Sequence, residues 1–86
     1  MPYFVYMIIS KVKNRHVSYV GYTKNIKNRL SLHNSSKGAK FTKGKQWKLV
    51  YKKEYSTKSI AMQKEYDLKK NRKLRDKIKM NFVKKI

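Results

Sequence analysis

The pattern of apolar and polar positions predicts three β-strands. Residues 3–9 are mostly β-branched and aromatic, too short a run for a convincing helix, and predict a strand buried on at least one face. Strand character resumes over residues 16–21 after a polar segment with Asn14 as a turn residue, so the two segments predict a hairpin. Apolar and charged residues then alternate over 47–55 with the period of a third strand.

Three helices and one loop complete the predicted order β-β-α-β-α-α. The first helix runs from an N-cap at Thr23 to about residue 34, the second covers about 58–70 after a cap at residues 56–57, and the third covers about 72–82. Residues 35–46 hold four lysines and two glycines without apolar periodicity and predict a basic, mobile loop. We therefore expect an α+β fold, a small three-stranded antiparallel sheet with the first strand in the middle and helices on its faces, as one domain over residues 1–86.

Composition adds a strong preference for anionic partners. The 86 residues allow one small core, and 24 Lys and Arg against four acidic residues give a net charge of +20. Nucleic acid is the leading partner, and the excess of lysine over arginine suits phosphate contact better than base reading, so we expect weak sequence specificity. The alternative is that a lysine-rich surface reflects only solubility or genome composition.

The sequence also limits the compartment and the chemistry. The absence of cysteine excludes disulfides, thiolate nucleophiles and cysteine-based zinc sites. The longest apolar run is far below the roughly 20 residues that span a bilayer, and no leader precedes it, so an intracellular, cytoplasmic protein is expected. We expect the protein to bind neither a membrane nor an obligate protein partner. A basic protein associated with an anionic membrane surface or with the ribosome is the weaker alternative.

Two polar side chains interrupt the apolar stripe of the first predicted helix. Ile26 and Leu30 define the stripe, and Arg29 and His33 each follow a stripe member by three residues. Both side chains are therefore expected at the edge of the core face. The structural alternative is that Arg29 pairs with an acid on another helix while His33 stabilises the helix C-terminus.

A carboxylate interrupts the next long helix in the same way. Glu65 lies four residues after Ala61 and three before Leu68, against the apolar stripe. An unpaired charge there is unfavourable, so Glu65 is expected to form a salt bridge, with Arg29 for example, or to hold a cation. With Tyr6 and Tyr19 on adjacent strands, these residues suit phosphodiester hydrolysis, which needs a hard oxygen ligand for Mg²⁺, a cation for the phosphate and a base for water.

These residues resemble the GIY-YIG nuclease superfamily over nearly the whole chain. The sequence carries Phe4-Val-Tyr6 and Tyr19-Val-Gly21, then Asn25, Arg29 and His33 at fixed offsets, then residues 37–42, then Glu65-Tyr66 followed by Lys69-Lys70. The ordered set is more specific than any one of its elements. The resemblance is strongest to small, stand-alone bacterial proteins related to the nuclease domain of structure-specific endonucleases.

The resemblance implies a role for each of these residues. Glu65 would be the single protein ligand of Mg²⁺ or Mn²⁺, Arg29 would bind the scissile phosphate, and either Tyr6 or Tyr19 would activate water, with His33 relaying the proton. Gly21 would be a structural part of the motif. DNA would be contacted by a basic and aromatic set: Lys37, Lys40, Phe41, Lys43, Lys69 and Lys70. Lys69 to Lys79 is equally well explained as a solvated face or as a surface along the phosphate backbone.

Three positions depart from the family pattern. Phe4 replaces a glycine, a change that a strand tolerates. Tyr22 replaces a lysine that can assist the base, so either His33 compensates or catalysis is slower. Phe41 replaces a tyrosine and keeps a ring that could stack on an unpaired base.

The residues and the resemblance together imply a divalent-metal-dependent DNA endonuclease of low sequence specificity, with RNA open as a substrate. DNA repair or recombination is the process that the resemblance suggests, and the sequence does not decide it. The alternative is a catalytically weak or inactive nucleic-acid-binding protein that retains the fold.

Overall fold

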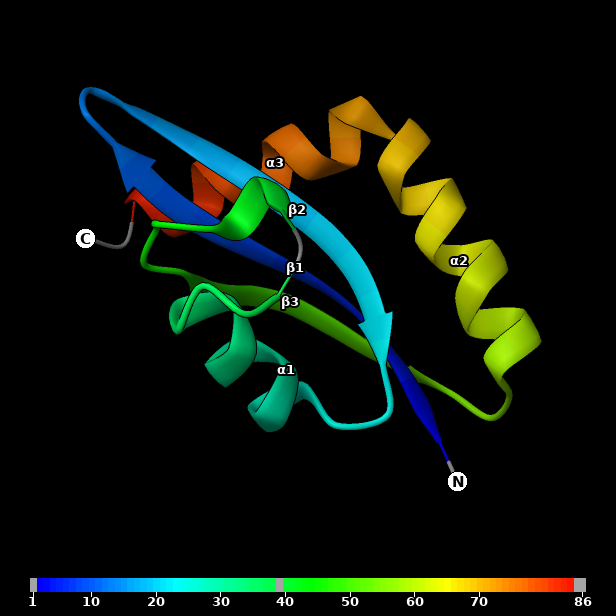
Figure 1. Cartoon of the computed structure of the whole chain (residues 1–86). Coiled ribbons are helices and arrows are strands. Elements are labelled where there is room, and N and C mark those ends of the chain that lie inside the picture. The colour runs from blue at the N-terminus through cyan, green and yellow to red at the C-terminus, as the bar shows by residue number, and fades with distance from the viewer. Residues whose placement is uncertain (1, 39, 85–86) are drawn as a thin grey trace.

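A computed structural model describes residues 2–38 and 40–84, and its elements follow the predicted order (Figure 1). The elements are β1 (Tyr3–Val12), β2 (Arg15–Thr23), α1 (Ile26–Asn34), the 3₁₀ turn η1 (Lys40–Thr42), β3 (Lys48–Tyr55), α2 (Lys58–Lys70) and α3 (Arg72–Lys84). The predicted α+β class and the predicted element order β-β-α-β-α-α are confirmed.

The three strands form one antiparallel sheet in the order β2-β1-β3, so the first strand of the hairpin is central, as predicted. The hairpin register places Tyr6 opposite Gly21 and Ile8 opposite Tyr19. Because side chains alternate between the faces of a strand, all four of these residues point to the same face. The register with β3 shifts between Met7 and Ile8, where β3 carries one extra residue.

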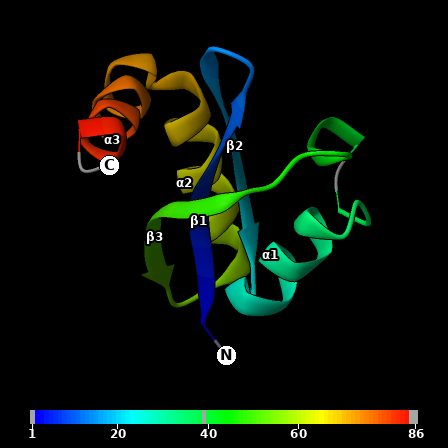
Figure 2. The same cartoon turned by 90° about the vertical axis from the view of Figure 1, so that its left-hand side faces the viewer.

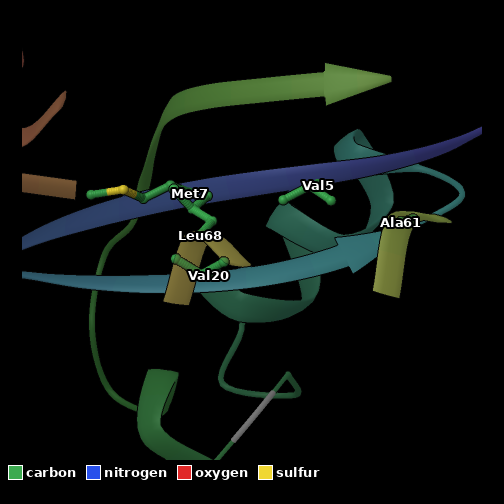
Figure 3. Packing of buried hydrophobic residues seen from close by; sticks show 5 residues of the cluster. All are labelled: Val5, Met7, Val20, Ala61 and Leu68. Carbon is green, nitrogen blue, oxygen red and sulfur yellow. The ribbon is translucent and has the colours of Figure 1, made fainter. Parts of the chain in front are cut away.

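Helices α2 and α3 cover the opposite face of the sheet (Figure 2). Val5 and Met7 of β1 and Val20 of β2 pack there against Ala61 and Leu68 of α2 (Figure 3). Burial of each large aliphatic side chain stabilises the fold by about 1.5–3 kcal/mol. This cluster fixes α2, and therefore Glu65, against the hairpin.

Helix α1 and the segment that follows it lie on the other face (Figure 2). Tyr6, Ile8 and Trp47 are buried there, with Ile26 and Leu30 of α1 packed against them. Since β1 is covered on both faces, its residues read as a continuous apolar run, which is the pattern that predicted a buried strand.

Three details differ from the sequence prediction. The N-cap of α1 is Asn25, which accepts a hydrogen bond from the Asn28 amide, and not Thr23, which ends β2 and accepts one from the Asn25 amide. The predicted loop over residues 35–46 contains the turn η1, where Thr42 is buried. The first two strands extend beyond their predicted limits.

No helix in the described part of the chain combines the length and the apolar character needed to cross a membrane.

Candidate active site

A cleft of about 620 Å³ opens at the β2 edge of the sheet, where both layers of helices approach the hairpin. Residues from both strands of the hairpin and from two helices line it, among them Tyr6, Tyr19, Gly21, Asn25, Arg29 and Glu65. The cleft thus brings together four of the five predicted catalytic residues from segments up to 59 positions apart in the sequence, from Tyr6 to Glu65. The fifth, His33, lies behind Tyr6.

His33 is hydrogen-bonded through both ring nitrogens. Its Nε2 lies 2.9 Å from Oη of Tyr6, and its Nδ1 lies 2.8 Å from Oγ1 of Thr42. The imidazole is 1% exposed and Tyr6 is 3% exposed. The inward position predicted for His33 is therefore confirmed, and the ring joins the cleft wall to the η1 turn.

Two glycines allow this arrangement. A Cβ at Gly21 would lie 2.6 Å from Oη of Tyr6, and a Cβ at Gly38 would clash with the ring of His33. Any larger residue at either position would displace one member of the hydrogen-bonded pair. Gly21, predicted as a structural part of the motif, has this steric role, and Gly38 has the corresponding role beneath the imidazole.

Burial disfavours charge on both members of the pair. Burial raises the pKa of the Tyr6 phenol well above its ordinary 10.0, with Tyr19 adding to the shift. Burial, followed by the Arg29 charge, lowers the pKa of His33 below its ordinary 6.5. His33 is therefore neutral near pH 7, and a neutral imidazole can accept a proton.

Arg29 lies on the surface, whereas the sequence predicted it at the edge of the core face. Its side chain is exposed and lines the cleft one helical turn before His33. At the N-terminal end of α1, the side of the helix that carries Arg29 faces the open cleft and not the packed core. The guanidinium of Arg29 therefore remains in water. Its positive charge still lowers the pKa of both Tyr6 and His33.

Glu65 is half-buried in the cleft wall, as predicted. Its side chain is 18% exposed, and Oε1 lies 3.4 Å from Nζ of Lys69, one turn later on α2. Among the described residues no ion pair joins Glu65 to Arg29, so that structural alternative is not observed. A pair with a half-exposed lysine at this spacing stabilises a helix by only about 0.2–0.5 kcal/mol.

The donor set at Glu65 fits one hydrated divalent cation. Mg²⁺ keeps several waters and is commonly bound by one or two carboxylates together with substrate phosphates. No group of three or more His, Cys, Asp or Glu residues that could enclose a metal occurs in the described ranges. His33 is unsuited to metal binding here because both of its nitrogens are hydrogen-bonded.

The predicted DNA-contacting residues fall into two groups on different elements. Lys37, Lys40, Phe41 and Lys43 are exposed on the segment after α1. Lys69 and Lys70 lie on α2, where Lys69 pairs with Glu65 and the Lys70 ammonium lies 4.7 Å from the ring centroid of Tyr66.

Sequence reasoning missed the part that Thr42 and Gly38 play at His33. Both lie in the quoted 37–42 stretch but received no role, because their contacts run across a loop that has no periodic pattern. The available signal was local: a glycine and a hydroxyl residue a few positions after a histidine on a helix. Trp47 donates from its indole nitrogen to the Thr42 carbonyl oxygen at 3.0 Å and so holds the turn in place.

The fold and the cleft define a small α+β domain with two tyrosines, an arginine, a histidine and a glutamate at one sheet edge. Residues 2–79 match the family model of the GIY-YIG catalytic domain. The chain belongs to the GIY-YIG family, and through it to a nuclease and hydrolase superfamily with nucleic acid as the implied substrate class.

Relatives of similar size occur in several bacteria. A UPF0213 protein of Staphylococcus haemolyticus is 45% identical over 65 residues, covering 74% of this chain and 78% of the relative. A UPF0213 protein of Oceanobacillus iheyensis is 40% identical over 65 residues, covering 74% of this chain and 74% of the relative. A UPF0213 protein of Staphylococcus epidermidis is 41% identical over 68 residues, covering 78% of this chain and 79% of the relative. No solved structure gives a significant match.

Proposed function

We propose that this protein is a divalent-metal-dependent endonuclease that hydrolyses phosphodiester bonds of DNA with low sequence specificity. The observation that carries the proposal is the 2.9 Å contact between Oη of Tyr6 and Nε2 of His33 in the wall of a cleft that Arg29 and Glu65 also line. A protein that only binds DNA has no need of a neutral, buried histidine linked to the solvent through a tyrosine. DNA repair or recombination is the process in which such a nuclease would act.

Tyr6 and His33 form the proton path. A phenol with a raised pKa is a poor base by itself, but it can take a proton from water while it passes its own to Nε2 of His33. In this step the water oxygen bonds to phosphorus, the bond from phosphorus to the leaving sugar oxygen breaks, and solvent protonates that oxygen. The structure thus favours Tyr6 over Tyr19 as the relay.

Arg29 would bind the phosphate, and Tyr19 would shield the imidazole of His33. The Arg29 guanidinium is exposed in the cleft, where it can neutralise charge on the scissile phosphate through two parallel hydrogen bonds. The ring of Tyr19 lines the cleft and packs on His33 with centroids 5.1 Å apart. Its bulk keeps the imidazole away from water.

Glu65 would hold Mg²⁺ or Mn²⁺ in exchange for its contact with Lys69. The cation, when bound, supplies charge that polarises the phosphate and stabilises the leaving oxygen. Release of Lys69 is inexpensive because its ion pair with Glu65 is weak.

The ion pair of Glu65 with Lys69 also favours a second candidate, a nucleic-acid-binding protein that keeps the fold without turnover. Tyr22 also favours this candidate, because it replaces the lysine that can assist the base in the family pattern. This candidate predicts strong, salt-sensitive binding without cleavage in any metal.

A cleavage assay separates the two candidates. Wild type and Glu65→Gln are compared on labelled single-stranded, duplex and branched DNA with Mg²⁺, Mn²⁺ or a chelator. We expect metal-dependent cleavage that falls at least about 100-fold in Glu65→Gln while binding changes little. Binding without cleavage on every substrate would instead establish the second candidate.

Asp67→Asn provides a matched control for the loss of one negative charge on α2. Asp67 is exposed and accepts a hydrogen bond from Gln63 at 3.0 Å, outside the cleft. Its substitution should leave cleavage within about twofold of wild type, as is usual for surface changes.

A further inference from the structure

The ring of Phe41 lies on the surface beside the cleft. Phe41 is the middle residue of η1 and is 51% exposed. Its ring is inclined by only 20° to that of Tyr19, with centroids 6.3 Å apart. Because Tyr19 lines the cleft, Phe41 extends the aromatic wall of the cleft outward.

We propose that Phe41 and Tyr19 form a stacking platform for an unpaired base of the DNA strand whose phosphate enters the cleft. The proposal rests on the proposed function and defines its substrate class as DNA that is single-stranded beside the cut. A base inside a duplex has both of its faces covered by neighbours, whereas an unpaired base offers a free face to an aromatic ring.

The charges around Phe41 match this occupant. Lys40 and Lys43 flank the ring in sequence and are exposed. Lys45 lies with its Nζ 5.1 Å from the ring centroid and donates to the Phe41 carbonyl oxygen at 3.0 Å. A cation over an exposed ring is weakly held, so a phosphate can draw Lys45 away and leave the ring face for the base.

The platform is also rigidly supported. Next to Phe41, Thr42 is buried and hydrogen-bonded to His33. The ring centroids of Phe41 and Trp47 lie 6.2 Å apart. An exposed aromatic ring on a fixed turn loses little conformational entropy when a base stacks on it. A ring that merely filled a gap in the loop would be buried.

Tyr66 supplies a matched control elsewhere on the surface. It is 52% exposed and has the Lys70 ammonium 4.7 Å from its ring centroid, but it does not line the cleft. Phe41 and Tyr66 therefore share exposure and a neighbouring lysine and differ in position.

The experiment measures binding without cleavage, in a chelator. Fluorescence anisotropy compares wild type, Phe41→Leu, Phe41→Trp and Tyr66→Leu on a single-stranded oligonucleotide that contains 2-aminopurine and on a blunt duplex of the same sequence. Phe41→Leu should weaken single-strand binding by about 5- to 150-fold and remove 2-aminopurine quenching, while duplex binding changes less than twofold. Phe41→Trp should retain both properties, and Tyr66→Leu should alter neither.

Several results would overturn the platform. These are unchanged single-strand binding in Phe41→Leu, equal losses on both DNA forms, or an equal loss in Tyr66→Leu. If Phe41→Leu lost binding to anionic vesicles while its DNA binding stayed intact, Phe41 would belong to a membrane-binding surface instead. The binding experiment is done without metal and does not depend on cleavage. Absence of cleavage in the assay of the proposed function would therefore overturn the nuclease, but it would not affect a stacking platform found in the binding experiment.

Discussion

The hydroxyl of Thr42 lies 2.8 Å from Nδ1 of His33, nine residues earlier in the chain, and the opposite ring nitrogen faces Tyr6. The bond at Nδ1 sets the orientation of the imidazole and the tautomer that Tyr6 meets. When Thr42 accepts from Nδ1–H, Nε2 is left as the acceptor that a proton relay needs. Thr42 is therefore a positioning residue for His33.

Thr42→Val keeps the shape of the side chain and removes the hydroxyl. We expect kcat to fall about tenfold or more with KM within about twofold, because substrate contacts are unchanged while the proton acceptor is misoriented. Thr42→Ser should restore most of kcat. A kcat within twofold of wild type in Thr42→Val would show that Thr42 has no such role.

We expect the lowered pKa of His33 to make both activity and stability fall in acid. Unfolded His33 binds a proton near pH 6.5, whereas folded His33 stays neutral to a lower pH. The unfolded state thus binds more protons in that interval, so the free energy of unfolding is highest above pH 6.5 and decreases as the pH falls through it. The proposed relay also requires neutral His33, so kcat/KM should be flat above pH 6.5 and drop only below it.

An NMR titration of the histidine Cε1–H signals checks this shift directly. The chain has only two histidines, and a His16→Gln variant assigns the signals. After burial, the Arg29 charge is the cause that lowers the pKa of His33, so Arg29→Gln should raise the His33 midpoint. A wild-type midpoint at or above 6.5 would contradict the assignment.

Gly21→Ala tests the close approach of the two hairpin strands at the site. The added methyl group would lie 2.6 Å from Oη of Tyr6, so Tyr6 must move away from His33. We expect kcat to fall by about 10- to 100-fold. Gly44→Ala is the matched control: its methyl group meets nothing within 4 Å, and its φ of +76° costs about 1 kcal/mol of stability without affecting kcat.

The sequence predicted the fold well because its apolar patterns are local. The buried run of β1, the alternation in β3 and the Thr57 cap of α2 each depend on neighbouring residues, and all three occur as predicted. The N-cap of α1 was misplaced because Thr23 and Asn25 both cap well and only the end of β2 decides between them.

The candidate site was less predictable because its contacts are long-range. Helical spacing placed His33 inward correctly, but the same spacing placed Arg29 at the core edge, and only the position of the cleft leaves it exposed. The contact of Thr42 with His33 depends on how residues 35–46 fold back, for which the sequence carries no periodic signal.

Asn34 should be a stability determinant of the loop that carries η1. Its side-chain amide donates to the Trp47 carbonyl oxygen at 3.2 Å, and its oxygen accepts from the Trp47 amide. Asn34→Ala removes both bonds beside a buried indole, so we expect a loss of about 1–3 kcal/mol in the free energy of unfolding. Urea unfolding followed by the fluorescence of Trp47 measures it, since the chain has one tryptophan.

Asn81→Ala is the comparison for that loss, since Asn81 is exposed on α3. Its replacement should leave stability unchanged or slightly higher because alanine favours helix. A loss below about 0.5 kcal/mol in Asn34→Ala would mean that the two bonds do not secure the loop.

The salt dependence of binding should identify which lysines meet the phosphates. With a net charge of +20, any lysine adds to the overall attraction, so only local contacts distinguish one cluster from another. Lys40→Gln with Lys43→Gln removes two charges from the segment beside the cleft, and Lys77→Gln with Lys84→Gln removes two from exposed positions of α3. For single-stranded DNA the slope of log K against log salt should become shallower by about 0.7 for each lost phosphate contact. We expect this change in the first double variant and none in the second, where only a small, uniform loss of affinity remains. Equal changes of slope in both variants would instead show that α3 follows the phosphate backbone, and the DNA path would then extend from the cleft across the far face of the protein.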